Sequence, residues 1–213
     1  MIGVLRQFVR AASSPRQAPG GKCEICSREL AVTHKHLLEL ASRKMVCACD
    51  ACAILFSAQG NAKFRRVPRQ IRFLPDFRMT DSQWDSLMMP INMAFFFRSS
   101  PEARVVAMYP SPAGATESLL SLEAWDEIAD ANPQLQHMDS DVEALLVNRI
   151  GHSRGFAGAE YYLLPIDQCF RLVGIIRSHW RGFSGGTEVW QQIAAFFDAL
   201  RNSATVLGGG GYA

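Results

Sequence analysis

Two Cys-x-x-Cys pairs constrain the fold of this chain more than any other feature of its sequence. Cys23 and Cys26 form the first pair, and Cys49 and Cys52 form the second after twenty-two intervening residues. Two residues between the cysteines of a pair allow both sulfur atoms to face one ion, and zinc binds thiolates at about 2.3 Å. The sequence therefore predicts a tetrahedral zinc site built from four thiolates of two separate segments.

The position of the remaining cysteines bears on the choice between zinc, disulfides and an iron–sulfur cluster. Five of the six cysteines lie between positions 23 and 52, whereas a disulfide framework would spread them along the chain. Clustering of this kind in a reducing compartment favours a metal site. Cys47 is one more thiol than zinc needs. It is either an ordinary strand residue or, with Cys49, Cys52 and one cysteine of the first pair, a ligand of an iron–sulfur cluster.

The segment between the two pairs predicts how they meet. "HKHLLEL" and "KMVCA" flank "ASR" and indicate a hairpin, and "DACAILFSA" indicates a helix that runs until Gly60. A knuckle, a hairpin and a helix that starts with the last two ligands form the treble-clef arrangement. Because side chains alternate along a strand, His34 and His36 would share one face. One of these histidines could replace a cysteine as a metal ligand, or both could be polar residues on an exposed strand.

The rest of the chain predicts an α+β fold in which a small N-terminal treble-clef or zinc-ribbon-like module precedes a mixed domain of antiparallel sheet and helices. We expect a disordered start at residues 1–21, the cysteine module at 22–62, the α+β domain at 73–204 and a flexible tail at 205–213. "KFRRVPRQIRF" is a basic connector between the two folded parts.

Apolar periodicity places the elements of the large domain. It predicts four strands, at 91–99, 103–110, 141–150 and 160–164, with the Gly-rich turn "GHSRGFAGA" before the last. It predicts helices after Thr80 or Asp81, after Ser118, from Asp167 as N-cap, and from Thr187 as N-cap. Trp84, Leu87 and Met88 would share the buried face of the first helix, which ends at Pro90. The last helix would bury Val189, Trp190, Ile193, Phe196, Phe197 and Leu200. "AMYPSPAGATES" is expected to connect a strand to a helix.

Composition excludes several classes of function. No apolar run reaches the length that spans a membrane, and Arg6 and Arg10 interrupt the apolar start, so we expect neither a signal peptide nor a location outside the cytoplasm. The chain has no HExxH motif and no complete phosphate-binding motif, and no residue is assigned a catalytic role. Residues 1–78 carry a net charge of +9 and the remainder −7. The basic front supports nucleic-acid binding electrostatically, but the stacking aromatics of single-strand readers are missing.

The cysteine module and four later stretches resemble a bacterial protein family whose biochemical activity is not established. These stretches are "MYPSPAGATES", "DVEALLVNR", "PIDQCFRLVGIIRSHWRGFSGG" and "VWQQIAAFF". Members of that family are typically encoded beside actinobacterial-type, high-affinity nickel–iron hydrogenases, amid maturation genes. The resemblance covers roughly residues 22–200 and implies a role in hydrogenase assembly, maturation or structural support. It also implies a family pattern that contains Cys23, Cys26, His34, His36, Cys47, Cys49 and Cys52.

These observations together predict a non-enzymatic, zinc-binding accessory protein of the cytoplasm. By the resemblance, its partner would be a hydrogenase subunit or a maturation factor. An iron–sulfur carrier or electron-transfer accessory of the same system is the first alternative, and its colour would distinguish it from a colourless zinc protein. A zinc-finger protein that binds nucleic acid is the second alternative, which the sequence supports least.

Overall fold

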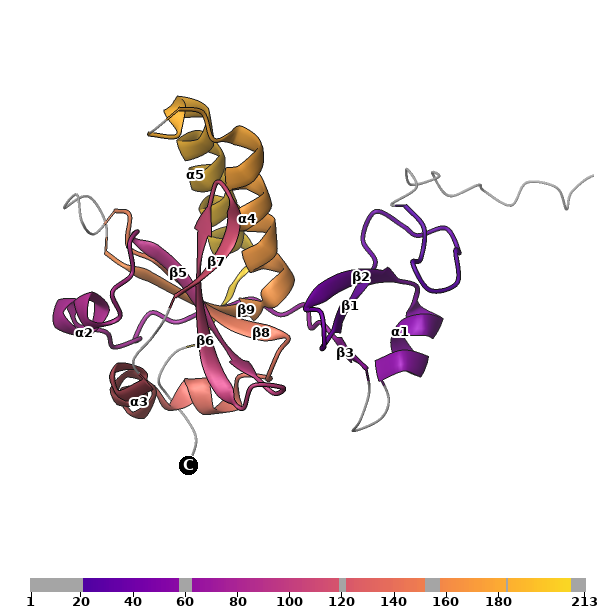
Figure 1. The fold of residues 1–213 in the computed structure, drawn as a ribbon, viewed down its shortest axis with the longest axis horizontal. Helices are drawn as coiled ribbons and strands as arrows, with labels where there is room; N and C mark the ends of the chain where they lie inside the picture. The colour runs from indigo at the N-terminus through magenta and orange to yellow at the C-terminus, as the bar shows by residue number, and fades with distance from the viewer. Residues whose placement is uncertain (1–20, 58–62, 119–121, 152–157, 183, 208–213) are drawn as a thin grey trace, which may run out of the picture.

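A computed structural model describes residues 21–57, 63–118, 122–151, 158–182 and 184–207 as a mixed α+β structure with two β-sheets (Figure 1). The expected disordered start lies outside the described residues except for Gly21, as do Gly60, most of the Gly-rich turn and the end of the expected tail. None of the helices in the described ranges is long and apolar enough to cross a bilayer.

The cysteine-rich segment forms a three-stranded antiparallel sheet and one helix. Strands β1 (Lys35–Glu39) and β2 (Lys44–Ala48) form the predicted hairpin, and α1 (Asp50–Ser57) is the predicted helix. A third strand, β3 (Phe64–Arg66), pairs with the other edge of β1. The basic connector is therefore not a plain linker, because its first part belongs to this sheet.

The large sheet has seven strands in the order β10-β4-β9-β8-β5-β6-β7. Its neighbours are antiparallel except for the pair β10 and β4. The strands are β4 (Arg72–Phe73), β5 (Met93–Ser99), β6 (Arg104–Ser111), β7 (Gly114–Ser118), β8 (Glu143–Asn148), β9 (Glu160–Pro165) and β10 (Thr205–Val206). The sequence predicts four of these seven; β4 and β10 have two residues each, too few to show a period of two.

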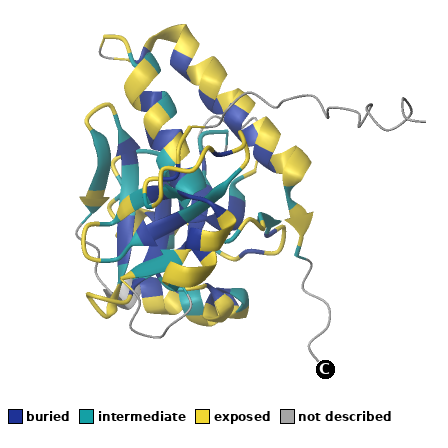
Figure 2. Ribbon diagram, turned by 90° about the vertical axis from the view of Figure 1, so that its right-hand side faces the viewer, coloured by how far each residue is buried: buried dark blue, intermediate teal, exposed yellow. Residues whose placement is uncertain are grey.

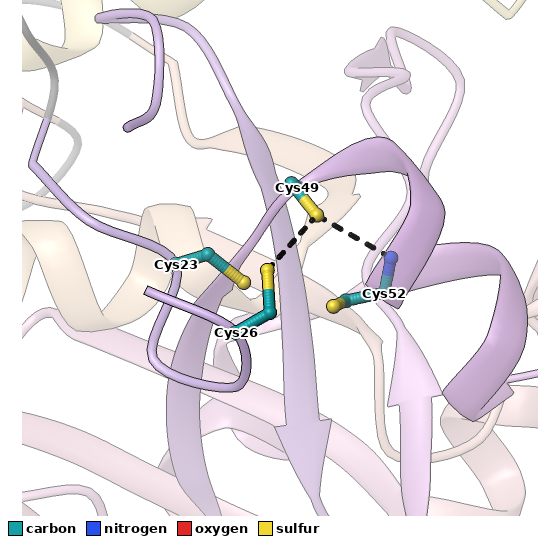
Figure 3. A group of neighbouring side chains, drawn as sticks. All are labelled: Cys23, Cys26, Cys49 and Cys52. Carbon is teal, nitrogen blue, oxygen red and sulfur yellow. Dashed lines mark hydrogen bonds between the residues drawn. The ribbon is translucent and has the colours of Figure 1, made fainter. Parts of the chain in front are cut away.

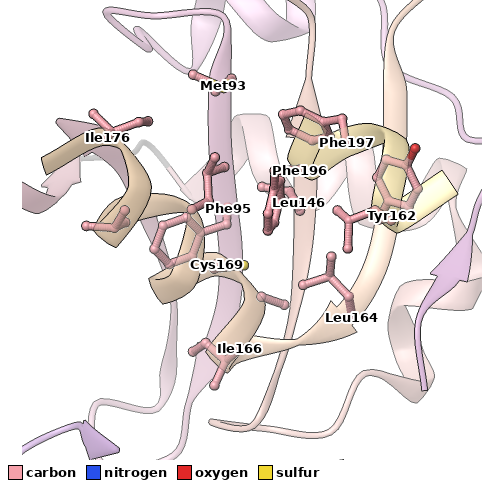
Figure 4. Close-up of a cluster of buried hydrophobic side chains, with 14 of the residues drawn as sticks. Met93, Phe95, Leu146, Tyr162, Leu164, Ile166, Cys169, Ile176, Phe196 and Phe197 are labelled. Atoms are coloured by element: carbon pink, nitrogen blue, oxygen red, sulfur yellow. The ribbon is translucent and has the colours of Figure 1, made fainter. Parts of the chain in front are cut away.

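Helices cover both faces of this sheet, which explains why its central strands read as unbroken apolar runs (Figure 1). In β5, Phe95 packs with α4 (Ile166–His179) and α5 (Gly186–Ser203) (Figure 4). Phe97 belongs to the same buried cluster. Phe96, which points to the opposite face, stacks on Trp125. That face is covered by α2 (Asp81–Ser86), α3 (Leu122–Ala131) and the 3₁₀ turn η1 (Pro133–His137).

Burial follows this layered arrangement. Figure 2 shows buried residues in the sheets and on the inward faces of the long helices, with exposed residues on their outer faces. Cys169 is fully buried in the layer of α4 and α5. Burial raises the pKa of this thiol well above its ordinary value, so it stays neutral.

The stretch "AMYPSPAGATES" forms a hairpin rather than a connection to a helix. Ser111 pairs with Gly114 at the end of β6 and β7, and the Ser111 hydroxyl donates to the Gly114 carbonyl oxygen at 2.9 Å. Pro110 lies beyond the last residue of β6 that pairs with β5, a position where a missing N–H is tolerated. Ser118 is therefore the last residue of a strand and not a helix cap.

Two other helix starts also differ from prediction. Helix α5 begins at Gly186 with Gly185, not Thr187, as its N-cap. Gly185 has φ +87°, and a Cβ there would lie 2.8 Å from the Val189 side chain, so the turn requires glycine. Helix α4 is preceded by Pro165, which places Asp167 in its first turn instead of at the cap. The carboxylate of Asp167 is thus available for another contact.

Helix α2 has the predicted N-cap but ends early. The Thr80 hydroxyl accepts from the Gln83 N–H, and the Gln83 side chain accepts from the Thr80 N–H, forming a capping box. The chain leaves the helix at Leu87, so Met88 is 81% exposed instead of buried. Trp190 is also 37% exposed, because its indole N–H donates to the Ser184 carbonyl oxygen on the surface of the protein.

The three-stranded sheet is joined to the large domain by apolar and charged contacts. Leu38 of β1, Val67 and Val142 form one buried cluster. Beside it, Arg65 lies 3.3 Å from the Asp141 carboxylate, and Arg43 forms an ion pair with Glu102. The face of β1 that carries Leu38 is therefore turned toward the large domain.

Candidate metal centre

The first cysteine pair lies on a tight turn before β1. The Cys23 N–H donates to the Arg28 carbonyl oxygen, and the Ser27 N–H donates to the Cys23 carbonyl oxygen, each at 2.8 Å. Ser27 adopts φ +62°, which allows the chain to reverse within four residues. This turn directs the sulfur atoms of both Cys23 and Cys26 to the same side (Figure 3).

The second pair lies at the junction of β2 and α1. Cys49 directly precedes the helix, and its sulfur atom accepts from the Cys52 N–H at 3.5 Å. Cys52 is in the first helical turn, where backbone N–H groups have no partner within the helix. The β1–β2 hairpin reverses the chain and so brings the second pair beside the first. Figure 3 shows the four sulfur atoms converging from both segments.

The spacing of the sulfur atoms fits one tetrahedral ion. All four Sγ atoms lie within 4.8 Å of one another, and those of Cys26 and Cys49 are 3.7 Å apart. Four thiolates at about 2.3 Å from one zinc ion would have Sγ atoms about 3.8 Å apart. All six cysteines of the chain are free, so no disulfide competes for these sulfurs. The four cysteines can therefore hold a metal ion such as zinc.

The backbone around the four sulfurs sets their pKa values apart. Burial alone would raise the pKa of the Cys23 thiol, but N–H groups of Cys49, Cys26 and Ile25 outweigh it and lower that pKa to about 6. The Cys52 N–H likewise lowers the pKa of Cys49. Burial, with the neighbouring cysteines, raises the pKa of Cys52 to about 12. The backbone thus favours the thiolate form of Cys23 and Cys49, and a bound cation would favour ionisation of the buried Cys52.

The surroundings of the cysteines favour a structural role for a bound ion. Cys23, Cys49 and Cys52 are buried in the small core of the module, whose other members are Leu30, Leu37, Val46, Ala48 and Ala53. Only Cys26 is exposed. Four thiolates would fill the coordination shell of zinc and leave no position for a substrate, as in structural sites.

The other candidate ligands do not join this group. Cys47 lies one residue before Ala48, so its side chain leaves β2 on the other face, although it still packs against the core that contains the cysteines. There it forms a separate group with His34 and His36. Burial, followed by the charges of Glu24 and Cys23, raises the pKa of the Cys47 thiol. The role of the seven residues as ligands stays a prediction, but the structure divides them into two groups.

Two residues near these groups were not expected from the sequence. The Glu24 carboxylate accepts from the Cys47 N–H at 2.6 Å and from the Lys44 ammonium group at 3.2 Å, and so fastens the first cysteine turn to β2. Asp167 reaches the module from α4 and contacts His36. The position of Glu24 between two cysteines could have indicated a role beside the metal group. The sequence gives no such indication for Asp167, which is 131 residues from His36.

Comparison with known proteins identifies the chain only at the level of a family. No curated protein and no solved structure matches it. One family model, described as a family of unknown function (DUF5947), matches residues 22–204. This range includes both cysteine pairs and every strand of the seven-stranded sheet except β10. The chain therefore belongs to this uncharacterised family.

Proposed function

We propose that the chain is a non-enzymatic accessory protein whose cysteine module is a structural zinc centre of treble-clef type. The observation that carries this proposal is the convergence of four free cysteines from a turn and a helix start on one point. The order of turn, hairpin and helix agrees with a treble clef. Zinc would connect the turn to the helix and stabilise the small core of the module.

The spacing of the sulfurs supports one ion over a cluster. Four thiolates that share a single ion all lie close together, whereas the thiolates of a cluster are spread over two or more irons. All four Sγ atoms lie within 4.8 Å of one another, which supports a single ion. Cys47, the surplus thiol of the cluster interpretation, groups with His34 and His36 and not with the four converging cysteines. An iron–sulfur carrier is thus the alternative, and metal analysis decides between them.

We propose further that the module docks on a protein through the outer face of α1. Ile54 and Leu55 are 60% and 72% exposed, and Phe56 beside them is also exposed. Consecutive exposed apolar residues of this kind mark interaction surfaces. The resemblance described above suggests the partner, a nickel–iron hydrogenase subunit or a maturation factor. Location in the cytoplasm belongs to the same proposal.

Capture of partners from a hydrogen-oxidising host tests this function. We expect the full-length tagged protein to retain a hydrogenase subunit or a maturation protein, and Leu55→Asp to lose it because a carboxylate would have to be buried in an apolar contact. Zinc content should stay unchanged in Leu55→Asp, since the side chain of Leu55 is exposed whereas that of Cys52 is buried.

Met88→Asp is the matched control, because Met88 is also a highly exposed apolar residue and lies on the large domain. It should capture the same proteins as the wild type. Recovery of neither hydrogenase nor maturation proteins by the wild type would contradict the proposed partner, and equal capture by Leu55→Asp would contradict the proposed surface.

A further inference from the structure

The face of the β1–β2 hairpin opposite the four cysteines carries a second group of metal-ligand side chains. His36 and Cys47 are directly opposite each other in the hairpin register, and His34 lies two residues before His36. One ring nitrogen of each histidine and the sulfur of Cys47 lie within 4.8 Å of one another. Directly opposed strand residues share one face of the sheet, so the register itself brings these groups together.

Both histidine rings are held by one nitrogen, which leaves the other for a ligand. His34 Nδ1 lies 3.0 Å from the Ala31 carbonyl oxygen, and His36 Nδ1 lies 2.6 Å from the Asp167 carboxylate. A carbonyl or carboxylate oxygen can only accept, so each Nδ1 carries a proton, and in the neutral imidazole each Nε2 has a free lone pair. His34 Nε2 is buried and has no hydrogen-bond partner among the described residues. An unpaired buried acceptor is costly, and a bound cation would satisfy it.

We propose that His34, His36 and Cys47 form a second metal site that binds a first-row transition-metal dication of the zinc class. Two imidazoles and one thiolate suit zinc, cobalt, nickel or copper and do not suit calcium or magnesium, which prefer oxygen ligands. All three residues are partly exposed. Three protein ligands beside solvent leave a fourth position for water or an exchangeable ligand. This site differs from the closed four-cysteine centre in its ligands and its accessibility.

Asp167 acts in this site as a positioning residue. Histidines that bind metals commonly donate their second ring N–H to a carboxylate, which fixes the ring orientation and raises the basicity of the ligating nitrogen. Asp167 belongs to α4 of the large domain, whereas His36 belongs to β1 of the module. The ion would therefore lie where the module meets the large domain, and its affinity would depend on that contact.

Metal titration of the full-length protein tests the proposal. After removal of bound metal under reducing conditions, zinc or cobalt(II) is added and the equivalents bound are measured. We expect two equivalents per chain in the wild type and one in His36→Ala and in Cys47→Ser. The visible cobalt(II) spectrum should lose the bands that appear with the second equivalent and keep those of the four-thiolate centre. Retention of the first equivalent shows that these variants still fold.

Asp167→Asn separates positioning from ligation. It should still bind two equivalents, with the affinity for the second lowered about 10–100-fold. His179→Ala is the matched control for His36→Ala. Like His34, His179 bonds a carbonyl oxygen through Nδ1, but it lies at the end of α4 and is not part of the group of His34, His36 and Cys47. It should bind both equivalents as tightly as the wild type.

One equivalent in the wild type, or a second equivalent that His36→Ala and Cys47→Ser leave intact, would overturn the second site. An unchanged affinity in Asp167→Asn would overturn the positioning role. These outcomes are distinct from failure of the proposed zinc centre, which would appear as an unchanged metal count in Cys23→Ser.

Discussion

Replacing Cys23 by serine is expected to release the metal of the four-cysteine centre and to unfold the module around it, while the seven-stranded sheet stays folded. A structural zinc ion contributes on the order of 10 kcal/mol to the folding of a small domain. The core of the module is small and contains three of the four cysteines, so little apolar burial remains without the ion. Zinc analysis and limited proteolysis with mass spectrometry would check this, with new cleavage sites expected between residues 22 and 66.

Cys169→Ala is the matched control for this variant. Cys169 is a fully buried free cysteine of α4 that belongs to the core of the large domain and not to the core of the module. Its replacement should lower the stability of the large domain slightly and leave the zinc content unchanged. If Cys23→Ser and Cys49→Ser both keep the metal and the protease resistance of the wild type, the four-cysteine centre is wrong.

Phe96→Ala is expected to destabilise the large domain by about 3–5 kcal/mol, as truncations of fully buried phenylalanines do. Phe96 is completely buried, and its ring stacks on Trp125 with centroids 5.0 Å apart. The variant would leave a cavity between β5 and the layer of α2 and α3. Urea unfolding of the zinc-loaded protein, followed by tryptophan fluorescence, measures the change.

Phe56→Ala provides the comparison for this prediction. Phe56 is the same residue type but is 43% exposed on α1, so its truncation should cost less than about 1 kcal/mol. The layered fold requires a large difference between these two variants. A loss below about 1 kcal/mol in Phe96→Ala would contradict the arrangement of helices on both faces of the sheet.

The sequence predicts the parts of this fold that depend on local patterns. The spacing of the cysteines predicts which four lie together, and "ASR" between two apolar runs predicts the β1–β2 hairpin. The capping box at Thr80 and the apolar stripe of α5 are equally local. The predicted buried face of α5 is correct except for Trp190. Its indole stays partly exposed because its N–H donates to a carbonyl oxygen at the surface.

The parts that the sequence could not predict depend on contacts between distant segments. The role of Asp167 follows from its approach to His36, which the docking of α4 on the hairpin produces. The short strands β3, β4 and β10 are defined only by the strands that they pair with. Gly185, and not Thr187, is the cap of α5, and its close approach to Val189 is visible only in three dimensions.

Elemental analysis and the visible spectrum of the anaerobically purified protein test the central claim most directly. Four thiolates around one ion predict a colourless protein with at least one equivalent of zinc per chain, and loss of that equivalent in Cys49→Ser. Stoichiometric iron with a broad visible absorption band, or a wild-type protein that binds no metal under reducing conditions, would contradict the account.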